Sequence, residues 1–81
     1  MTPFEAVLKA TELGFRVEFY QCKDMPPTLR VRVLGAGSCM DAYTDLMVIP
    51  EIRESVIADA IEIATHNLQA YAAERLAEDL A

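Results

Sequence analysis

The amino-acid sequence predicts an α+β fold of the order αβββα, in which a three-stranded antiparallel sheet packs against a short N-terminal helix and a long C-terminal helix. Three observations support this prediction. The chain opens with a capped helix start, two segments with alternating apolar and polar residues follow, and residues 51–80 carry apolar side chains every three or four positions. With 81 residues, the chain is expected to form one small domain spanning 1–81.

The first helix is marked at both ends. Thr2 is a good N-cap, Pro3 suits the first helical position, and Glu5 stands three residues after the cap, as in a capping box. Gly14 can adopt the left-handed conformation that commonly ends a helix. The sequence therefore predicts a short helix between Thr2 and Gly14.

Two strands are predicted next, at residues 15–22 and 28–34. In both, apolar residues alternate with polar ones, the period of a strand with one buried face. The inward residues are Phe15, Val17 and Phe19 in the first strand and Leu29, Val31 and Val33 in the second. Turns are expected at 23–27, where two prolines cannot donate ladder hydrogen bonds, and at the glycine-rich residues 35–38.

The segment 39–49 fits either a strand or a helix. As a strand it places Met40, Ala42, Leu46 and Val48 on one face and Asp41, Tyr43 and Asp45 on the other. As a helix it has a possible capping box at Ser38 and Asp41. We favour the strand, because a two-stranded hairpin is barely stable alone whereas three strands can support a helix.

The last helix is long for so small a chain. Unbroken over 51–80 it would measure about 45 Å at ~1.5 Å per residue, whereas a domain of this size has a radius near ~12 Å. It must either bend near 65–67 or pack its C-terminal part on another subunit. We therefore expect a non-enzymatic protein-binding module that acts as a homo-oligomer, most simply a dimer. The predicted contact residues are Ile63, Leu68, Tyr71 and Leu76.

The charge of the chain is uneven. Of a formal −6, residues 1–34 hold five basic and four acidic side chains, and residues 35–81 hold two and nine. Direct nucleic-acid binding is not expected, since it needs clustered cations. The order of elements is similar to that of a double-stranded-RNA-binding domain, a family that holds phosphate with lysines at the start of its last helix. The corresponding segment here, 50–54, carries Glu51 and Glu54 instead.

Two alternative functions follow from this charge pattern. The first is a small acidic inhibitor, like certain phage anti-defence proteins, that occupies a basic nucleic-acid-binding surface of a host protein. Its predicted contact surface is Glu51, Glu54, Asp59 and Glu62. The second is a binder of small anionic ligands at a subunit interface, formed by Arg16, Arg30, Arg32, Tyr20 and Tyr43. The same arginines fit a cross-strand charge ladder with Glu18, which we favour over an anion site.

No cofactor, metal site or catalytic residue is predicted. Asp59, Glu62 and His66 share one side of a helix, but a polar stripe continues on both sides of them. Cys22 and Cys39 are expected to be free thiols, which favours a reducing cytoplasm. The longest apolar run, 46–49, is far shorter than the ~20 residues of a membrane span, so no membrane contact is expected.

Overall fold

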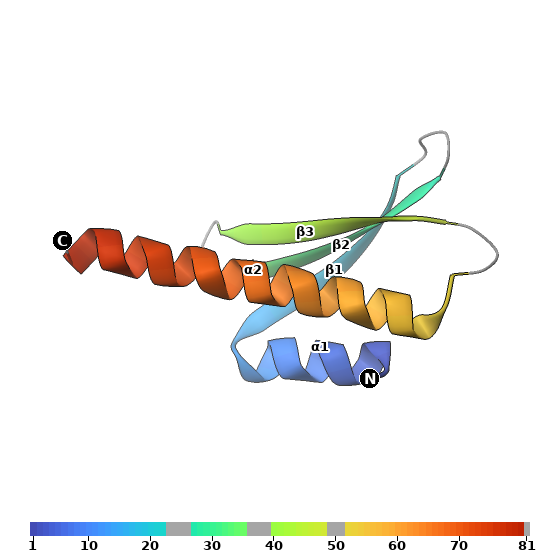
Figure 1. Ribbon diagram of the computed structural model, residues 1–81, viewed down its shortest axis with the longest axis horizontal. Helices are drawn as coiled ribbons and strands as arrows, with labels where there is room; N and C mark the ends of the chain where they lie inside the picture. The colour runs from blue at the N-terminus through green and yellow to red at the C-terminus, as the bar shows by residue number, and fades with distance from the viewer. Residues whose placement is uncertain (23–26, 36–39, 49–51, 81) are drawn as a thin grey trace.

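The computed structural model describes residues 1–22, 27–35, 40–48 and 52–80. The elements in chain order are α1 (Pro3–Glu12), β1 (Phe15–Cys22), β2 (Thr28–Gly35), β3 (Asp41–Met47) and α2 (Glu54–Leu80) (Figure 1). This order confirms the predicted αβββα fold, including the strand in the segment that also fitted a helix. The two predicted turns lie largely outside the described residues.

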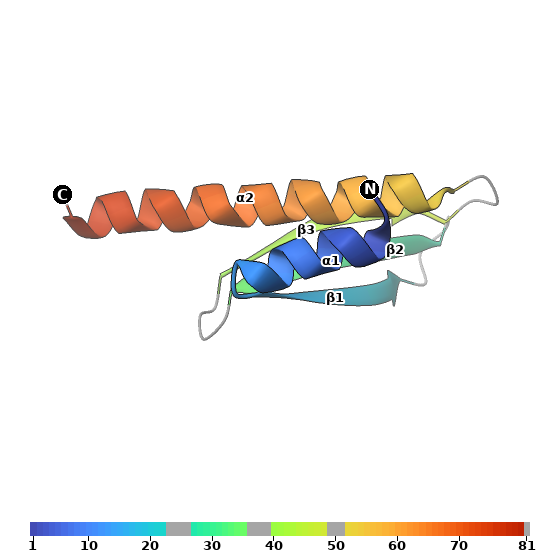
Figure 2. The ribbon, with the colours of Figure 1, turned by 90° about the horizontal axis from the view of Figure 1, so that it is seen from below.

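The three strands form an antiparallel sheet in the order β1-β2-β3. Val17 pairs with Val33, which in turn pairs with Ala42, so apolar residues line up across all three strands. Both helices lie on this apolar face, α1 against β1 and α2 against β2 and β3 (Figure 2). The other face carries no described helix and presents the polar residues of the alternating pattern.

The predicted ends of α1 are confirmed by its hydrogen bonds. The Thr2 hydroxyl accepts a bond of 3.2 Å from the backbone N–H of Glu5, and Pro3 stands in the first turn. Gly14 has φ +83°, the left-handed conformation predicted for it, and its N–H donates to the carbonyl of Thr11 at 2.9 Å. Chain reversal at this point places β1 antiparallel to α1.

Small side chains dominate the core. One cluster joins α1, β2 and α2, and the second joins β2, β3 and α2. Their buried members are Ala6, Val31, Ala58, Ala60 and Ile61 in the first, and Val33, Ala42, Ala64 and Leu68 in the second. Because alanines face each other across the two helices, α1 and α2 can pack closely.

Helix α2 runs without a break from Glu54 to Leu80, so the bend near 65–67 is wrong. The Thr65 hydroxyl donates a hydrogen bond of 2.7 Å to the carbonyl of Ile61 within the helix. The last buried residue is Leu68, and residues 69–79 are all exposed. This part of α2 extends beyond the end of the sheet (Figure 1), and the molecule is 47 Å long as a result. In the described part of the chain, neither helix has the length and apolar character needed to cross a membrane.

Candidate functional site

In the C-terminal part of α2, residues 69–79, the apolar side of the helix continues, but no sheet lies beneath it. Residues along a helix turn by about 100° each, so Ala72 and Leu76 continue the side that carries Ile61 and Leu68. Leu68 is 1% exposed, whereas Leu76 is 61% exposed. An apolar helix side that is buried along the sheet therefore becomes open beyond it.

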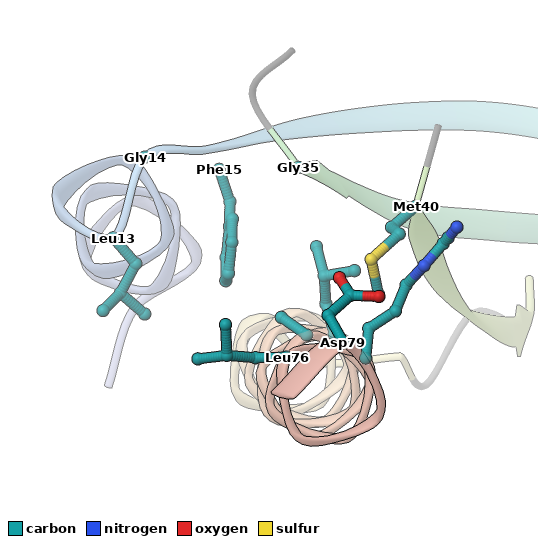
Figure 3. A pocket seen from close by; sticks show the side chains of 10 residues that line it. Leu13, Gly14, Phe15, Gly35, Met40, Leu76 and Asp79 are labelled. Carbon is teal, nitrogen blue, oxygen red and sulfur yellow. The ribbon is translucent and has the colours of Figure 1, made fainter. Parts of the chain in front are cut away.

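A groove of about 450 Å³ lies between this segment and the end of the sheet. Antiparallel pairing brings the start of β1, the end of β2 and the start of β3 to the same end of the sheet, which supplies Phe15, Gly35 and Met40. In Figure 3, Leu13, Phe15 and Leu76 project into the same space between α1 and α2. The remaining lining residues are Gly14, Leu68, Ala72, Arg75 and Asp79. The groove is apolar, with one cation and one carboxylate on its helical wall.

The structure separates the four residues predicted to contact another copy. Leu68 belongs to the core cluster with Val33 and Ala42 and also lines the groove, so its contact with another copy stays a prediction. Ile63, Tyr71 and Leu76 are exposed, but Leu76 lies about 140° around the helix from each of the other two. One flat surface cannot cover all three, and Leu76 is the one that lines the groove.

Sequence reasoning missed the other wall of this groove. Leu13 is the last apolar residue before the turn at Gly14, Phe15 is the first residue of β1, and Met40 directly precedes β3. These residues could have been assigned to one groove from two features together: their positions at the ends of elements and the register of the hairpins. The register had to be known first, because these residues are far apart in the chain.

The acidic side chains of α2 lie at its surface. Within the described ranges, none of them forms an ion pair. They are Glu54, Asp59, Glu62, Glu74, Glu78 and Asp79, against a single cation in the helix, Arg75. Glu51, which was predicted to extend this surface, lies outside the described residues. With six acids and one base, helix α2 therefore carries most of the net negative charge of the chain.

The predicted anion-binding residues do gather on the helix-free face of the sheet. Tyr20, Arg30, Arg32 and Tyr43 surround a hollow of about 390 Å³ together with Asp41. The Arg30 guanidinium lies 4.2 Å from the centroid of the Tyr43 ring, a cation–π contact. These side chains come from all three strands, which the register places level with one another.

Each arginine of this face is already paired with a carboxylate. Arg30 donates two hydrogen bonds to Asp45, at 2.8 and 3.0 Å, and this lowers the pKa of Asp45 and raises that of Arg30. Arg32 donates to Asp41 at 2.6 Å. Arg16 and Arg32 reach Glu18 at 3.8 and 3.9 Å, and Tyr20 donates to the same carboxylate at 2.9 Å.

An anionic ligand would have to displace these carboxylates, so the geometry favours the charge ladder. Three arginines face three carboxylates, and the face is close to neutral. Arg30 and Arg32 therefore hold neighbouring strands in register, in the way that opposite charges stabilise cross-strand pairs.

The remaining candidate chemistry finds little support. No group of three His, Cys, Asp or Glu side chains within the described ranges is placed to hold a metal ion. Cys22 is a half-buried free thiol, and Cys39 lies outside the described residues. Comparisons with protein-family models, with curated proteins and with solved structures found no match for this chain.

Proposed function

We propose that the protein is a non-enzymatic protein-binding module that acts as a homo-oligomer, with the C-terminal part of α2 as the contact between copies. One observation supports this most strongly. Residues 69–79 extend past the sheet and are exposed on every side, although Ala72 and Leu76 border an apolar groove. We expect the protein to act in the cytoplasm, because the Cys22 thiol is free and free thiols persist in reducing compartments.

The exposed part of α2 needs stabilisation from outside itself. Residues 69–79 are all exposed, and Ala72, Arg75, Leu76 and Asp79 border the rest of the domain across the groove. This segment therefore gains little of the tertiary packing that supplies most helix stability in proteins. The last turn also lacks a basic residue, while Glu78 and Asp79 place negative charge at the negative end of the helix dipole. A partner that covers this segment would supply the missing contacts.

A second copy is the partner that this geometry fits. Around a two-fold axis near Leu76, two antiparallel α2 helices place the exposed leucine of each copy over the groove of the other. The same arrangement brings Arg75 of one copy close to Asp79 of the other, so these charges are complementary. Contacts of this kind, repeated by a two-fold axis, are the commonest basis of homodimers.

The test is the mass in solution of the full chain and of two matched variants, by sedimentation velocity from low to high micromolar concentration. Ala72→Lys places a charge on the groove side, and Ala70→Lys places the same charge about 160° away around the helix. We expect Ala72→Lys to shift the assembly toward smaller species and Ala70→Lys to leave the mass unchanged. A parent chain that is monomeric at every concentration, or an Ala70→Lys variant that dissociates in place of Ala72→Lys, would overturn the proposal.

A second candidate is the acidic inhibitor that occupies a basic nucleic-acid-binding surface of a host protein. It is favoured by the unpaired carboxylates of α2, in contrast to the paired ones of the sheet. We expect the chain to displace DNA or RNA from such a protein in a manner that weakens with salt. Displacement that survives the double change Asp59→Lys and Glu62→Lys would exclude this surface as the contact.

A further inference from the structure

The free edge of β1 carries exposed apolar side chains. In the sheet, β1 pairs with β2 on one side, and no described strand pairs with its other side. Phe4 on α1 is 70% exposed, and Leu8 and Phe19 are also exposed. An open edge strand presents unpaired backbone N–H and C=O groups, which readily pair with another chain.

Phe4 and Phe19 lie level with each other along the molecule. Helix α1 and strand β1 run antiparallel from the turn at Leu13 and Gly14 (Figure 2). Phe19 is about 16 Å from Gly14 along a strand at ~3.3 Å per residue. Phe4 is about 15 Å from the same glycine along a helix at ~1.5 Å per residue.

The exposed side of α1 is turned toward the free edge of the sheet. Ala6 is buried against α2 residues, and Ala10 is buried on the same side of α1. At about 100° per residue, Phe4 and Leu8 lie about 140° and 180° from the mean direction of the two alanines. Because α1 covers β1 and α2 covers β2 and β3, the side facing away from α2 is the side of the β1 edge.

We propose that a second copy of the chain pairs with β1, antiparallel and edge to edge, with Val17 opposite its own counterpart. The two sheets then form one six-stranded sheet with all helices on the same face. In this register Phe15 of each copy faces Phe19 of the other on the helix side. On the opposite face, Arg16 of each copy faces Glu18 of the other, so two ion pairs form around the two-fold axis.

The charges on β1 select this register over its neighbours. A two-fold axis centred one residue earlier sets Arg16 opposite its own counterpart, and an axis centred one residue later does the same for Glu18. Both neighbouring registers oppose like charges, which destabilises a sheet. Arg16 is also available for the pairing, because its side chain is 72% exposed and reaches Glu18 of its own chain at 3.8 Å.

The other edge of the sheet lacks this self-complementary pattern. The polar face of β3 carries Asp41 and Asp45 without a cation between them. Both carboxylates are held by arginines of β2, at 2.6 and 2.8 Å. Because these acids are already paired within the chain, the β3 edge offers a second copy no cross-strand pair of opposite charges, and β1 is the edge that fits a second copy.

This inference does not rest on the proposed function, since it is argued from the free edge of β1 and not from α2, although Phe15 belongs to β1 and also lines the groove. Two different two-fold contacts on one chain build an assembly larger than a dimer. A substitution at each contact, made singly and together, therefore shows the contribution of each contact to the assembly. Either contact is free to fail without the other.

The test is light-scattering mass and sedimentation velocity on the full chain at moderate ionic strength. Arg16→Glu places like charges opposite each other in both cross-strand pairs, and we expect it to raise the dissociation constant by about tenfold or more. The matched control is Lys9→Glu, which makes the same change of charge at an exposed site of α1. Both substitutions are also made in the Ala72→Lys chain. In that chain the α2 contact is weakened, so the β1 contact is expected to hold the copies together.

The proposal is supported if Arg16→Glu lowers the mass in both backgrounds and Lys9→Glu does not. It is overturned if Arg16→Glu leaves the mass unchanged in both, whatever Ala72→Lys does. Amide hydrogen exchange supplies an independent readout. We expect the amides of β1 to be protected in the assembled chain and to exchange faster after Arg16→Glu, whereas equal exchange of the β1 and β3 edges in the assembled chain also overturns the pairing.

Discussion

Leu68 and Leu76 offer a direct test of where the core of this protein ends. The two residues lie two turns apart on the same side of α2, but Leu68 is 1% exposed and Leu76 is 61% exposed. Replacing Leu68 by alanine removes atoms packed between Val33, Ala42 and Ala64. Buried leucine-to-alanine changes lower the free energy of unfolding by about 3 kcal/mol, within a range of about 2–5. Leu76→Ala removes largely hydrated atoms, so it should change the stability of the folded monomer by less than about 0.5 kcal/mol.

The assay is urea and thermal unfolding followed by circular dichroism, at several protein concentrations. For a chain of this size, we expect Leu68→Ala to lower Tm by about 12 °C or more at every concentration. Leu76→Ala should leave Tm unchanged at low concentration and should reduce the rise of Tm with concentration that self-association produces. The reasoning is refuted if Leu76→Ala destabilises the dilute protein as much as Leu68→Ala, or if Leu68→Ala costs less than about 1 kcal/mol.

Two further outcomes are expected. Because Arg30 lowers the pKa of Asp45, the ionised pair stabilises the fold above the ordinary pKa of an aspartate and loses that effect as the pH falls through the lowered value. Asp45→Asn should therefore make Tm fall less steeply below about pH 4. A fall of Tm with pH as steep as that of the parent chain would contradict this. Gly14→Ala should lower the free energy of unfolding by about 1 kcal/mol, because alanine is strained at a φ of +83°. The added Cβ would meet nothing within 4 Å, so no steric clash adds to this cost. Urea titration measures the change, and a neutral or stabilising result would show that the backbone relaxes.

The sequence predicted the elements well where local chemistry defines them. Thr2 and Gly14 marked the ends of α1, and strict alternation identified β1 and β2 before any pairing was known. The segment 39–49 was different, since its apolar spacing fits two periods over a short length. Its strand, Asp41–Met47, is decided by pairing with β2, which no local signal reports.

The candidate sites were predicted less well, because they depend on which surfaces meet. The sequence placed Arg30 and Arg32 on one face with Tyr20, but their partners Asp45 and Asp41 come from a strand that only the register aligns with them. The predicted ligand site is therefore a set of ion pairs. Likewise, Leu13 and Met40 joined the groove because strand pairing brings distant element ends together.

By itself, the sequence determined the order of elements, the apolar and polar faces of the sheet and the concentration of acid in the second half of the chain. These properties follow from caps, turns and periodicity, which act over a few residues. Only the tertiary structure decided which apolar residues of α2 are buried. Leu68 and Leu76 look alike in the sequence, but the sheet ends between them, so one leucine lies in the core and the other is exposed beside the groove.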